Sequence, residues 1–279
     1  MSFFIVKNKM QSVLFLNIRE RISFIKIKRC TCMINILLNG CKGNMGTALT
    51  NYIKDSTSFN LLYGIDKVNC DLLHKINKKP DVIIDFSTPS STFVALNYAI
   101  ENLVPIVIAT TGFKNNDEIK IREFSEAIPI FKSANMSFGI NVFSNIASNL
   151  AKNLDKTDIE IVEKHHRQKV DAPSGTAFMI ADKINRECNG KYQYVFSRHD
   201  SSTVPSPKSY NEIGFSSIRG GDLVGEHTVF FIRENEMITI THSAYSRNIY
   251  IEGALRAAQF ILTKKNGLYN MEDLLQFTA

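Results

Sequence analysis

The chain has 279 residues, of which 44% are hydrophobic and 22% charged, a composition typical of a globular protein with room for two domains. No run of about 18 uncharged apolar residues occurs, so the sequence predicts no transmembrane helix and no membrane partner. Residues 1–32 hold seven basic residues and one acidic residue, whereas residues 33–279 hold 26 of each sign. This balance excludes a broad nucleic-acid-binding surface on the body of the protein.

Residues 1–32 carry the whole net charge of +6 and are interpreted as a leader. Their basic, Phe- and Ile-rich texture, directly before Met33, is typical of a targeting segment or of a start placed too early. We expect the leader to be disordered or removed, so that its deletion leaves activity and thermal stability unchanged. An organelle-targeting role stays open beside the cytoplasmic location expected for the protein.

The cysteines fit neither a disulfide framework, which needs an even number, nor the spacing of a metal site. They predict reduced thiols in a reducing compartment. The five positions are Cys30, Cys32, Cys41, Cys70 and Cys188.

From Met33 to about residue 142, short apolar strands alternate with helices. Strands are predicted within residues 34–40, 59–66, 81–91, 104–113 and 129–135, and helices within residues 41–55, 91–103 and 115–128. Several of the strands are apolar without interruption, which is typical of strands buried on both faces of a parallel sheet. The alternation therefore predicts a doubly wound, Rossmann-like parallel sheet.

After residue 142 the pattern changes. Helices are predicted within residues 141–154 and 174–188, and strands within 158–166, 213–221, 225–236 and 236–246, which together form an open, mixed or antiparallel sheet. From Tyr250 the spacing is helical again, and we expect the last 30 or so residues to pack on the first domain. The predicted fold is an α/β domain of residues 33–142 plus 248–279, with an inserted α+β substrate and oligomerisation domain of residues 143–247.

Three glycines, Gly40, Gly43 and Gly46, separate the first strand from the first helix. Glycines at such a turn let the backbone approach a pyrophosphate at the helix N-terminus. The spacing departs from G-x-G-x-x-G because Lys42 stands where the middle glycine is usual. Alone, the pattern is also compatible with a turn that binds nothing.

Asp66 ends the second strand, 20 residues after Gly46, where a carboxylate can accept hydrogen bonds from an adenine ribose. A turn residue without a ligand is the alternative. Lys67 follows directly, and its ammonium can tolerate a 2′-phosphate, so use of both NADH and NADPH is predicted. Two further strand ends, at residues 109–112 and 133–136, belong to the same edge of the sheet, and their small and hydroxyl side chains suit contact with a nicotinamide and its ribose.

The stretch from Glu163 to Ala177 reads EKHHRQKVDAPSGTA. His165, His166 and Lys169 directly follow a strand, so a loop could turn all three toward one cavity. No further ligand lies at a metal-binding interval and Lys169 disfavours a cation, so no metal site is predicted, although a plain surface loop stays possible. Ser174 is a candidate N-cap for the next helix, whose first amides point outward. Together these groups predict an anionic substrate that carries carboxylates.

This stretch resembles the signature E-x-H-H-x-x-K-x-D-A-P-S-G-T-A of the dihydrodipicolinate reductase family, whose members are also called 4-hydroxy-tetrahydrodipicolinate reductases. The resemblance runs from Met33 to the C-terminus through GCKGNMG, DVIIDFSTPSS, IATTGF, SANMSFGIN, IRGGDLVGEHTVFF and ITHSAYSRN. It implies reduction of a cyclic dicarboxylate with NADH or NADPH on the diaminopimelate route to lysine. It also implies a dinucleotide-binding domain, and a substrate domain whose sheets assemble a homotetramer.

The resemblance further implies a role for each matching residue. His165 would be the general acid/base and Lys169 the proton donor. Substrate binding would involve His166, Gly175 and Thr176, together with Ser174 at the start of the same helix. Arg247 also matches the family, and either a structural role or contact with a substrate carboxylate is open for it. Cofactor binding would involve Gly40, Cys41, Lys42, Gly43, Asn44, Met45, Asp66, Lys67, Ala109, Thr110, Thr111, Ser133, Ala134, Asn135 and Met136.

Ala109 departs from the family pattern, which usually has glycine there, and the stretch from Asp66 to Pro80 is short. Both departures from the family pattern affect which cofactor is preferred and how tightly it binds. Glu226 and His227 also match the family and are expected to form a partly buried structural pair. Two alternatives stay open: another two-domain NAD(P)-dependent dehydrogenase of a small carboxylate, and a non-catalytic dinucleotide sensor.

Overall fold

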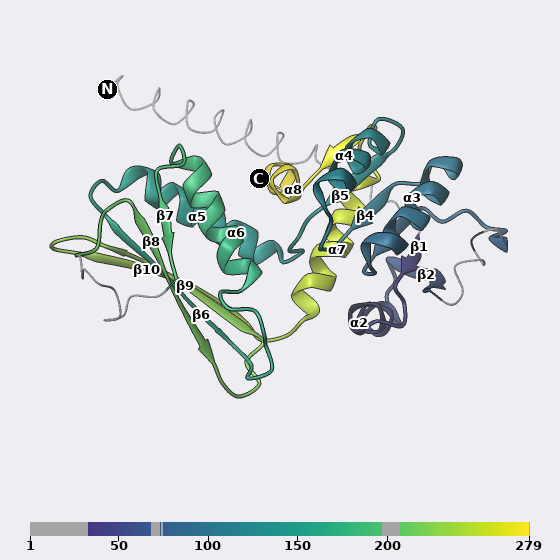
Figure 1. The fold of residues 1–279 in the computed structure, drawn as a ribbon. Coiled ribbons are helices and arrows are strands. Elements are labelled where there is room, and N and C mark those ends of the chain that lie inside the picture. Colours follow the sequence, from purple (N-terminus) through teal and green to yellow (C-terminus); the bar gives the residue numbers. More distant parts are fainter. Residues whose placement is uncertain (1–32, 68–72, 74, 197–206, 279) are drawn as a thin grey trace, which may run out of the picture.

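The computed structural model describes residues 33–67, 73, 75–196 and 207–278, and these residues form two sheets with separate cores (Figure 1). The predicted leader, Cys30, Cys32 and Cys70 lie outside the described residues. Of the cysteines within them, Cys41 and Cys188 are free thiols. No helix in the described ranges combines the length and apolar character needed to cross a bilayer.

The first sheet is parallel and has six strands in the order β11-β5-β4-β3-β1-β2. After β1 the chain moves outward to β2 and then returns to β3 on the other side of β1. Such a reversal opens a crevice at the carboxyl ends of the strands, where doubly wound proteins bind ligands. The strands are β1 (Ile34–Asn39), β2 (Phe59–Ile65), β3 (Val82–Asp85), β4 (Ile106–Ile108), β5 (Pro129–Lys132) and β11 (Gly267–Tyr269).

Helices cover both faces of this sheet, which explains why its strands are apolar without interruption. Ile36 and Leu38 of β1 pack with α2 (Asn44–Ile53), α7 (Asn248–Ile261) and α8 (Met271–Thr278). Leu37, between them, belongs to the opposite core with α3 (Pro89–Asn102) and α4 (Asn115–Phe124). The predicted Rossmann-like, doubly wound fold is confirmed.

The second sheet is mixed, in the order β10-β9-β6-β8-β7. Strand β6 pairs parallel with β8 and antiparallel with β9, which agrees with the predicted mixed sheet. Its elements are β6 (Asp158–His165), β7 (Gln193–Val195), β8 (Glu212–Arg219), β9 (Gly225–Ile232) and β10 (Met237–Ala244), with helices α5 (Phe138–Asn153) and α6 (Gly175–Glu187).

Strand β6 alternates strictly between half-buried and buried residues. Ile159 and Ile161 face α5 and α6 in the second core. Because side chains alternate along a strand, Glu163 and His165 continue the same buried face at its carboxyl end. The strand therefore delivers two polar side chains to the edge of an apolar core.

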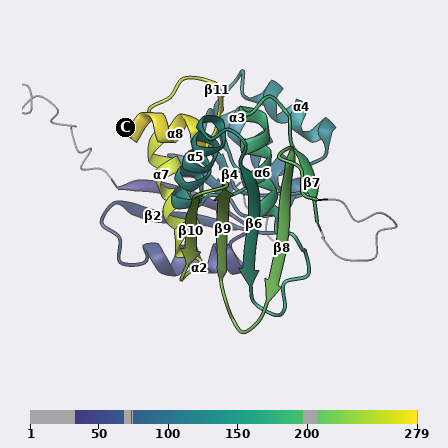
Figure 2. The ribbon, with the colours of Figure 1, turned by 90° about the vertical axis from the view of Figure 1, so that its left-hand side faces the viewer.

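The opposite face of this sheet is turned to the viewer in Figure 2, and no described helix lies over it. It carries the half-buried Val162 and Phe230, and Ile218, whose exposed fraction is 48%. Apolar side chains on a sheet face without a covering layer are typical of an assembly surface.

Helix α7 packs directly on the backbone that follows β5. A Cβ atom at Gly253 would lie 1.6 Å from the Met136 carbonyl oxygen, so only glycine permits this approach. The helix therefore belongs to the first core although it follows the second sheet in sequence. The exact domain limits at 142/143 and 247/248 stay predictions. Strands β7 and β11 and helix α8 were not predicted.

Candidate active site

The glycine turn between β1 and α2 is compact and lies against the end of β3. Gly40 has φ of 86°, and a Cβ atom there would lie 2.3 Å from the Phe86 carbonyl oxygen. A Cβ atom at Gly46 would lie 2.2 Å from the Gly40 carbonyl oxygen. Asn44 begins α2 and is exposed, so the first helix amides are open to an anion such as a pyrophosphate.

Asp66 lies just beyond β2 and forms an ion pair with Lys42, with 3.1 Å between Lys42 Nζ and Asp66 Oδ2. The Lys42 side chain is 70% exposed, whereas that of Asp66 is 12% exposed. The sequence assigned a phosphate-tolerating cation to Lys67 alone, which is exposed beside Asp66. The structure adds Lys42 at the same carboxylate.

A buried carboxylate, Asp85, joins the ends of β1 and β3. It accepts hydrogen bonds from Asn39 Nδ2 at 2.8 Å, from Thr92 Oγ1 at 2.6 Å and from the Ser87 hydroxyl. Ser87 in turn donates its backbone N–H to Thr110 Oγ1 at 2.8 Å, so the network reaches the end of β4. Burial raises the pKa of Asp85, although its hydroxyl and amide donors oppose the shift.

The residues after β5 connect the two halves of the molecule. Asn135 Oδ1 accepts the backbone N–H of Ser137 at 2.9 Å, and Asn135 Nδ2 donates to Thr176 Oγ1 at 3.0 Å. Because Thr176 is at the first turn of α6, this contact joins the predicted cofactor edge to the predicted substrate helix. At this junction Ser133 is half-buried and Ala134 exposed, while after β4 Thr110 is buried and Thr111 exposed.

His165 contacts a buried ion pair through its Nδ1 atom. Its Nδ1 lies 2.5 Å from Glu163 Oε2, and Arg219 donates to the two Glu163 oxygens at 2.9 and 2.6 Å. Burial lowers the pKa of His165, and the neighbouring Glu163 opposes this shift. Burial alone would raise the pKa of Glu163, but hydrogen bonds from Arg219, Ser217 and His165 outweigh it and lower the value.

Ser174 and His227 form a second buried contact. The Ser174 hydroxyl lies 2.9 Å from His227 Nε2 and accepts the backbone N–H of Ala177 at 3.2 Å, as a helix N-cap does. Ser174 is 1% exposed, so its side chain supports α6 and His227. Burial lowers the pKa of His227 to about 3, with a contribution from His165, and the ring is neutral at physiological pH.

Glu226 and His227 are half-buried and buried, and each has a polar partner, as expected. Because successive residues of β9 point to opposite faces of the sheet, His227 meets Ser174 on the inner face, whereas Glu226 accepts from Lys164 at 2.5 Å on the open face.

The loop after β6 carries the remaining predicted groups. Lys169 Nζ lies 2.7 Å from Asp171 Oδ1, and this hydrogen bond lowers the pKa of Asp171. His166 donates its backbone N–H to the Leu223 carbonyl, while its Nδ1 is buried without a hydrogen-bond partner among the described residues. Gly175 is exposed at the start of α6, and Arg247 is exposed directly before α7. This arrangement suits an anionic ligand.

A small cavity lies between the two halves and is lined by Asn135 of the predicted cofactor site, by Thr176 of the predicted substrate site, and by Gly225 and His227 of β9. No cluster of three potential metal ligands occurs in the described part of the chain.

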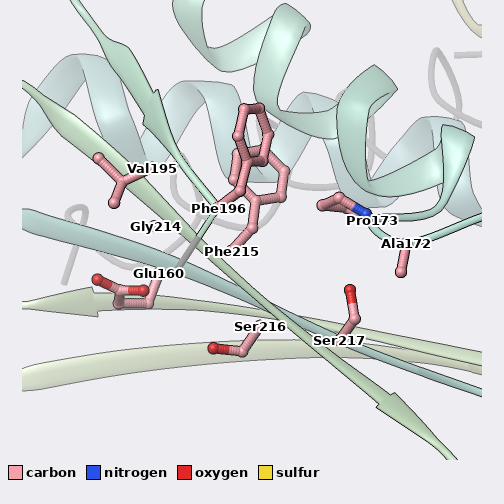
Figure 3. Close-up of a pocket in the computed structure, with 9 residues that line it drawn as sticks. All are labelled: Glu160, Ala172, Pro173, Val195, Phe196, Gly214, Phe215, Ser216 and Ser217. Atoms are coloured by element: carbon pink, nitrogen blue, oxygen red, sulfur yellow. The ribbon is translucent and has the colours of Figure 1, made fainter. Parts of the chain in front are cut away.

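A larger hollow of about 610 Å³ lies elsewhere, beside β7 and β8 (Figure 3). It contains Glu160, and Phe196 and Phe215 form its aromatic wall. Glu160 accepts from Lys208 at 2.5 Å, so the hollow offers no uncompensated cation to a dicarboxylate. The cavity between the halves is therefore the better candidate.

Comparisons with known proteins agree with this geometry. Residues 34–136 match the family described as dihydrodipicolinate reductase, N-terminus, and residues 139–275 match dihydrodipicolinate reductase, C-terminus. A 4-hydroxy-tetrahydrodipicolinate reductase of Caldanaerobacter subterraneus subsp. tengcongensis is 44% identical over 88% of this chain and 99% of that relative. The enzyme of the same name from Buchnera aphidicola subsp. Cinara cedri is 40% identical over 86% of this chain and 96% of its own length.

Solved structures share the fold. Dipicolinate-bound dihydrodipicolinate reductase from Paenisporosarcina sp. TG-14 superposes with a TM-score of 0.69 at 24% identity, covering 86% of this chain and 98% of that one. An amine dehydrogenase from Mycobacterium smegmatis follows with a TM-score of 0.57 at 8% identity, covering 86% and 95%. At these identities the structures establish the two-domain fold alone.

The Asp85 network predicts an unusual pH dependence of stability. Because burial raises the pKa of Asp85, its carboxyl contributes stability that is fully present below the unfolded pKa of about 3.9 and is lost as pH rises through the folded value. An amide in the same place can still accept from Asn39 and carries no charge. We therefore expect Asp85→Asn to fold and to gain stability relative to wild type as pH rises from about 4 to 8.

Urea unfolding at a series of pH values measures this difference. Asp85→Ala is the contrasting variant, because it leaves the Asn39 amide and the Thr92 hydroxyl without their acceptor, at about 1–3 kcal/mol for each group. A stability difference between Asp85→Asn and wild type that shrinks with rising pH would contradict the assignment.

Proposed function

The chain belongs to the dihydrodipicolinate reductase family, and we propose that it reduces 4-hydroxy-tetrahydrodipicolinate to tetrahydrodipicolinate with NADH or NADPH, in the diaminopimelate route to lysine. One observation carries this proposal: Asn135, at the dinucleotide edge of the first sheet, bonds Thr176 at the start of the helix that follows the cationic loop. This contact brings the proposed cofactor site next to the proposed substrate site, and a reductase needs its hydride donor and its substrate side by side.

The residues at the carboxyl ends of the first sheet fit a dinucleotide. The exposed amides at the start of α2 would take the pyrophosphate, and Asp66 the adenine ribose, beside Lys42. The ends of β4 and β5, including Ala109 and Asn135, would surround the nicotinamide. When bound, the reduced nicotinamide supplies a hydride for C4 of the substrate.

The chain's own groups would hold the dicarboxylate and manage protons. Loss of the 4-hydroxyl as water leaves a conjugated imine, and its reduction at C4 gives an enamine that must be protonated at the adjacent carbon. His165 is proposed to exchange that proton, since imidazole titrates near neutrality. Lys169 would bind a carboxylate and assist proton delivery, while His166 and the amides of Gly175 and Thr176 would complete the anion site.

The alternatives differ in what they require. Another dehydrogenase of a small carboxylate would need the glycine turn and Asp66, but has no need for the complete loop of His165, His166 and Lys169. A dinucleotide sensor would bind NADH without turnover. Coupling the protein to the synthase that makes the unstable hydroxy substrate, and following nicotinamide absorbance, separates all three.

The open face of the second sheet supports a homotetramer built through these sheets. Ile218 and Met237 are 48% and 58% exposed on it. Sedimentation equilibrium is expected to give four times the mass of one chain, and Ile218→Glu to dissociate it. A monomeric wild-type protein would exclude the proposal.

We also propose domain limits at 142/143 and 247/248, and a cytoplasmic location. The free thiols Cys41 and Cys188 are consistent with a reducing compartment. Cell fractionation tests the location.

Variants of the cationic loop test the catalytic assignment. His165→Gln is expected to lower kcat about 10²–10⁴-fold while KM stays much closer to wild type, because a proton delivered in the transition state affects turnover. Lys169→Met is expected to damage both constants, and His166→Gln mainly KM. Steady-state kinetics, on variants that keep their fold and NADH affinity, measure this. Near-normal turnover of His165→Gln across the pH range would remove that histidine from the mechanism.

A second set of variants tests the cofactor assignment. Asp66→Ala is expected to weaken NADH more than NADPH, because only the unphosphorylated ribose offers a 2′-hydroxyl to the carboxylate. The matched control is Asp55→Ala, an exposed carboxylate of the same domain. Dissociation constants for both nucleotides provide the readout, and an equal loss for both would exclude Asp66 from the ribose site.

A further inference from the structure

Glu163 is the most completely buried charged group near the cationic loop. It precedes His165 by two residues on the same face of β6, and its side chain is 1% exposed. Arg219 lies beside His165 in the parallel register of β6 and β8, and its guanidinium spans both Glu163 oxygens. A buried carboxylate in this setting is matched by a fork of two charge-assisted hydrogen bonds.

The charge of Glu163 determines which nitrogen of His165 carries a proton. Arg219 keeps Glu163 ionised, and an ionised carboxylate can only accept hydrogen bonds. The 2.5 Å contact therefore requires a hydrogen on His165 Nδ1, which leaves Nε2 as the atom that gains and loses a proton. This is the logic by which a buried carboxylate orients a catalytic imidazole.

The ring is also confined from its other side. A Cβ atom at Gly225 would lie 2.9 Å from His165 Nε2. Only glycine at position 225 therefore leaves room for this nitrogen. The His227 ring meets that of His165 edge to face, with 5.1 Å between centroids. Gly225 and His227 both line the small cavity between the halves. The ring of His165 therefore lies against two residues that line the cavity proposed for the substrate, with Nε2 on the side of Gly225.

Arg219 connects this arrangement to the proton-donating lysine. Its Nη2 also donates to the Asp171 carbonyl oxygen at 2.6 Å, and the Asp171 carboxylate pairs with Lys169. One guanidinium thus contacts the carboxylate behind His165 and the backbone of the loop segment that positions Lys169.

We propose that Glu163 and Arg219 are positioning residues of the reaction, which fix the ring and tautomer of His165 so that Nε2 exchanges the proton, and which hold the Lys169–Asp171 segment in register with it. This inference rests on the proposed function. Neither residue touches substrate or cofactor in this scheme. Both act through His165 and the loop.

The charges around His165 determine how its activity depends on pH. Glu163 on β6 favours the protonated ring, whereas burial, Lys169 on the loop and Arg219 on β8 oppose it, and His227 on β9 is neutral. A ring that donates its proton as imidazolium supports turnover at low pH and loses it as pH rises through its pKa. Removing the negative charge of Glu163 therefore moves the alkaline limb of the kcat profile to lower pH.

Glu163→Gln is the central test, because it keeps the shape and an accepting oxygen but removes the charge. We expect kcat to fall on the order of 10²-fold, with the alkaline limb at lower pH, while KM and NADH affinity stay close to wild type. Glu187→Gln, which removes a surface carboxylate paired with Lys152, is the control and is expected to change none of these. Unchanged kcat and pH profile in a folded Glu163→Gln would overturn the proposal.

The double variant Glu163→Gln/Arg219→Met removes both charges and guards against misfolding from an unpaired buried arginine.

Gly225→Ala provides a test that leaves the ion pair intact, since the added methyl displaces the ring near Nε2. Its matched control is Gly214→Ala, where the added methyl meets only the carboxylate end of Glu160. We expect kcat to fall in the double variant and in Gly225→Ala, and to persist in Gly214→Ala. Wild-type kcat in the first two would overturn the proposal.

A measurement on the resting protein separates this inference from the proposed function. Long-range ¹⁵N NMR of His165 in the wild-type chain is expected to show the Nδ1–H tautomer, with Nε2 titrating, and a lower titration midpoint in Glu163→Gln. An Nε2–H tautomer in wild type would overturn the inference, whatever the assay gives. If the tautomer is as expected but the wild-type protein does not reduce the hydroxy dicarboxylate, the proposed function fails instead.

Discussion

A carboxylate can be buried only where neighbouring groups replace the water it has lost, and each half of the site is arranged around one such group. Asp85 is surrounded by hydroxyl and amide donors, so burial prevails and raises its pKa. Glu163 meets a guanidinium, which keeps its pKa low. The first arrangement joins three strand ends through uncharged hydrogen-bond donors. The second holds a negative charge beside the imidazole that is proposed to exchange a proton.

The sequence predicted what depends on local pattern. Uninterrupted apolar runs such as residues 36–38 indicate a sheet covered on both faces, and the glycine turn before α2 marks the strand end where a phosphate could bind. The loop after β6 was recognisable from its residue types alone. Strands β7 and β11 have three residues each, too few for a periodicity to appear.

What the sequence did not predict depends on contacts between distant residues. Arg219 lies beside His165 only because β6 and β8 pair in parallel with a particular register, and nothing near position 219 indicates that pairing. Lys42 reaches Asp66 for a similar reason, because the parallel pairing of β1 and β2 brings the ends of these strands together. Strand alternation already requires that Glu226 and His227 point to opposite faces, but their partners Lys164 and Ser174 depend on the tertiary structure. Ser174 was correctly read as an N-cap, but its inward contact with His227 needs the tertiary structure.

The ion pairs of the site fall into two kinds, and the difference bears on how ligands bind. Lys42–Asp66 and Lys169–Asp171 each have one strongly exposed partner, with side-chain exposures of 70% for Lys42 and 56% for Asp171. Solvent-screened pairs of this kind are worth only about 0–1 kcal/mol, so an incoming ribose phosphate or substrate carboxylate can replace one partner at little cost. Arg219–Glu163 is shielded, and removing one partner would leave an uncompensated buried charge. Exchangeable pairs therefore lie where ligands are proposed to bind, while the permanent pair lies behind the residue proposed to move the proton. In the proposed reaction, this division would let the ligand positions adapt without disturbing the geometry of His165.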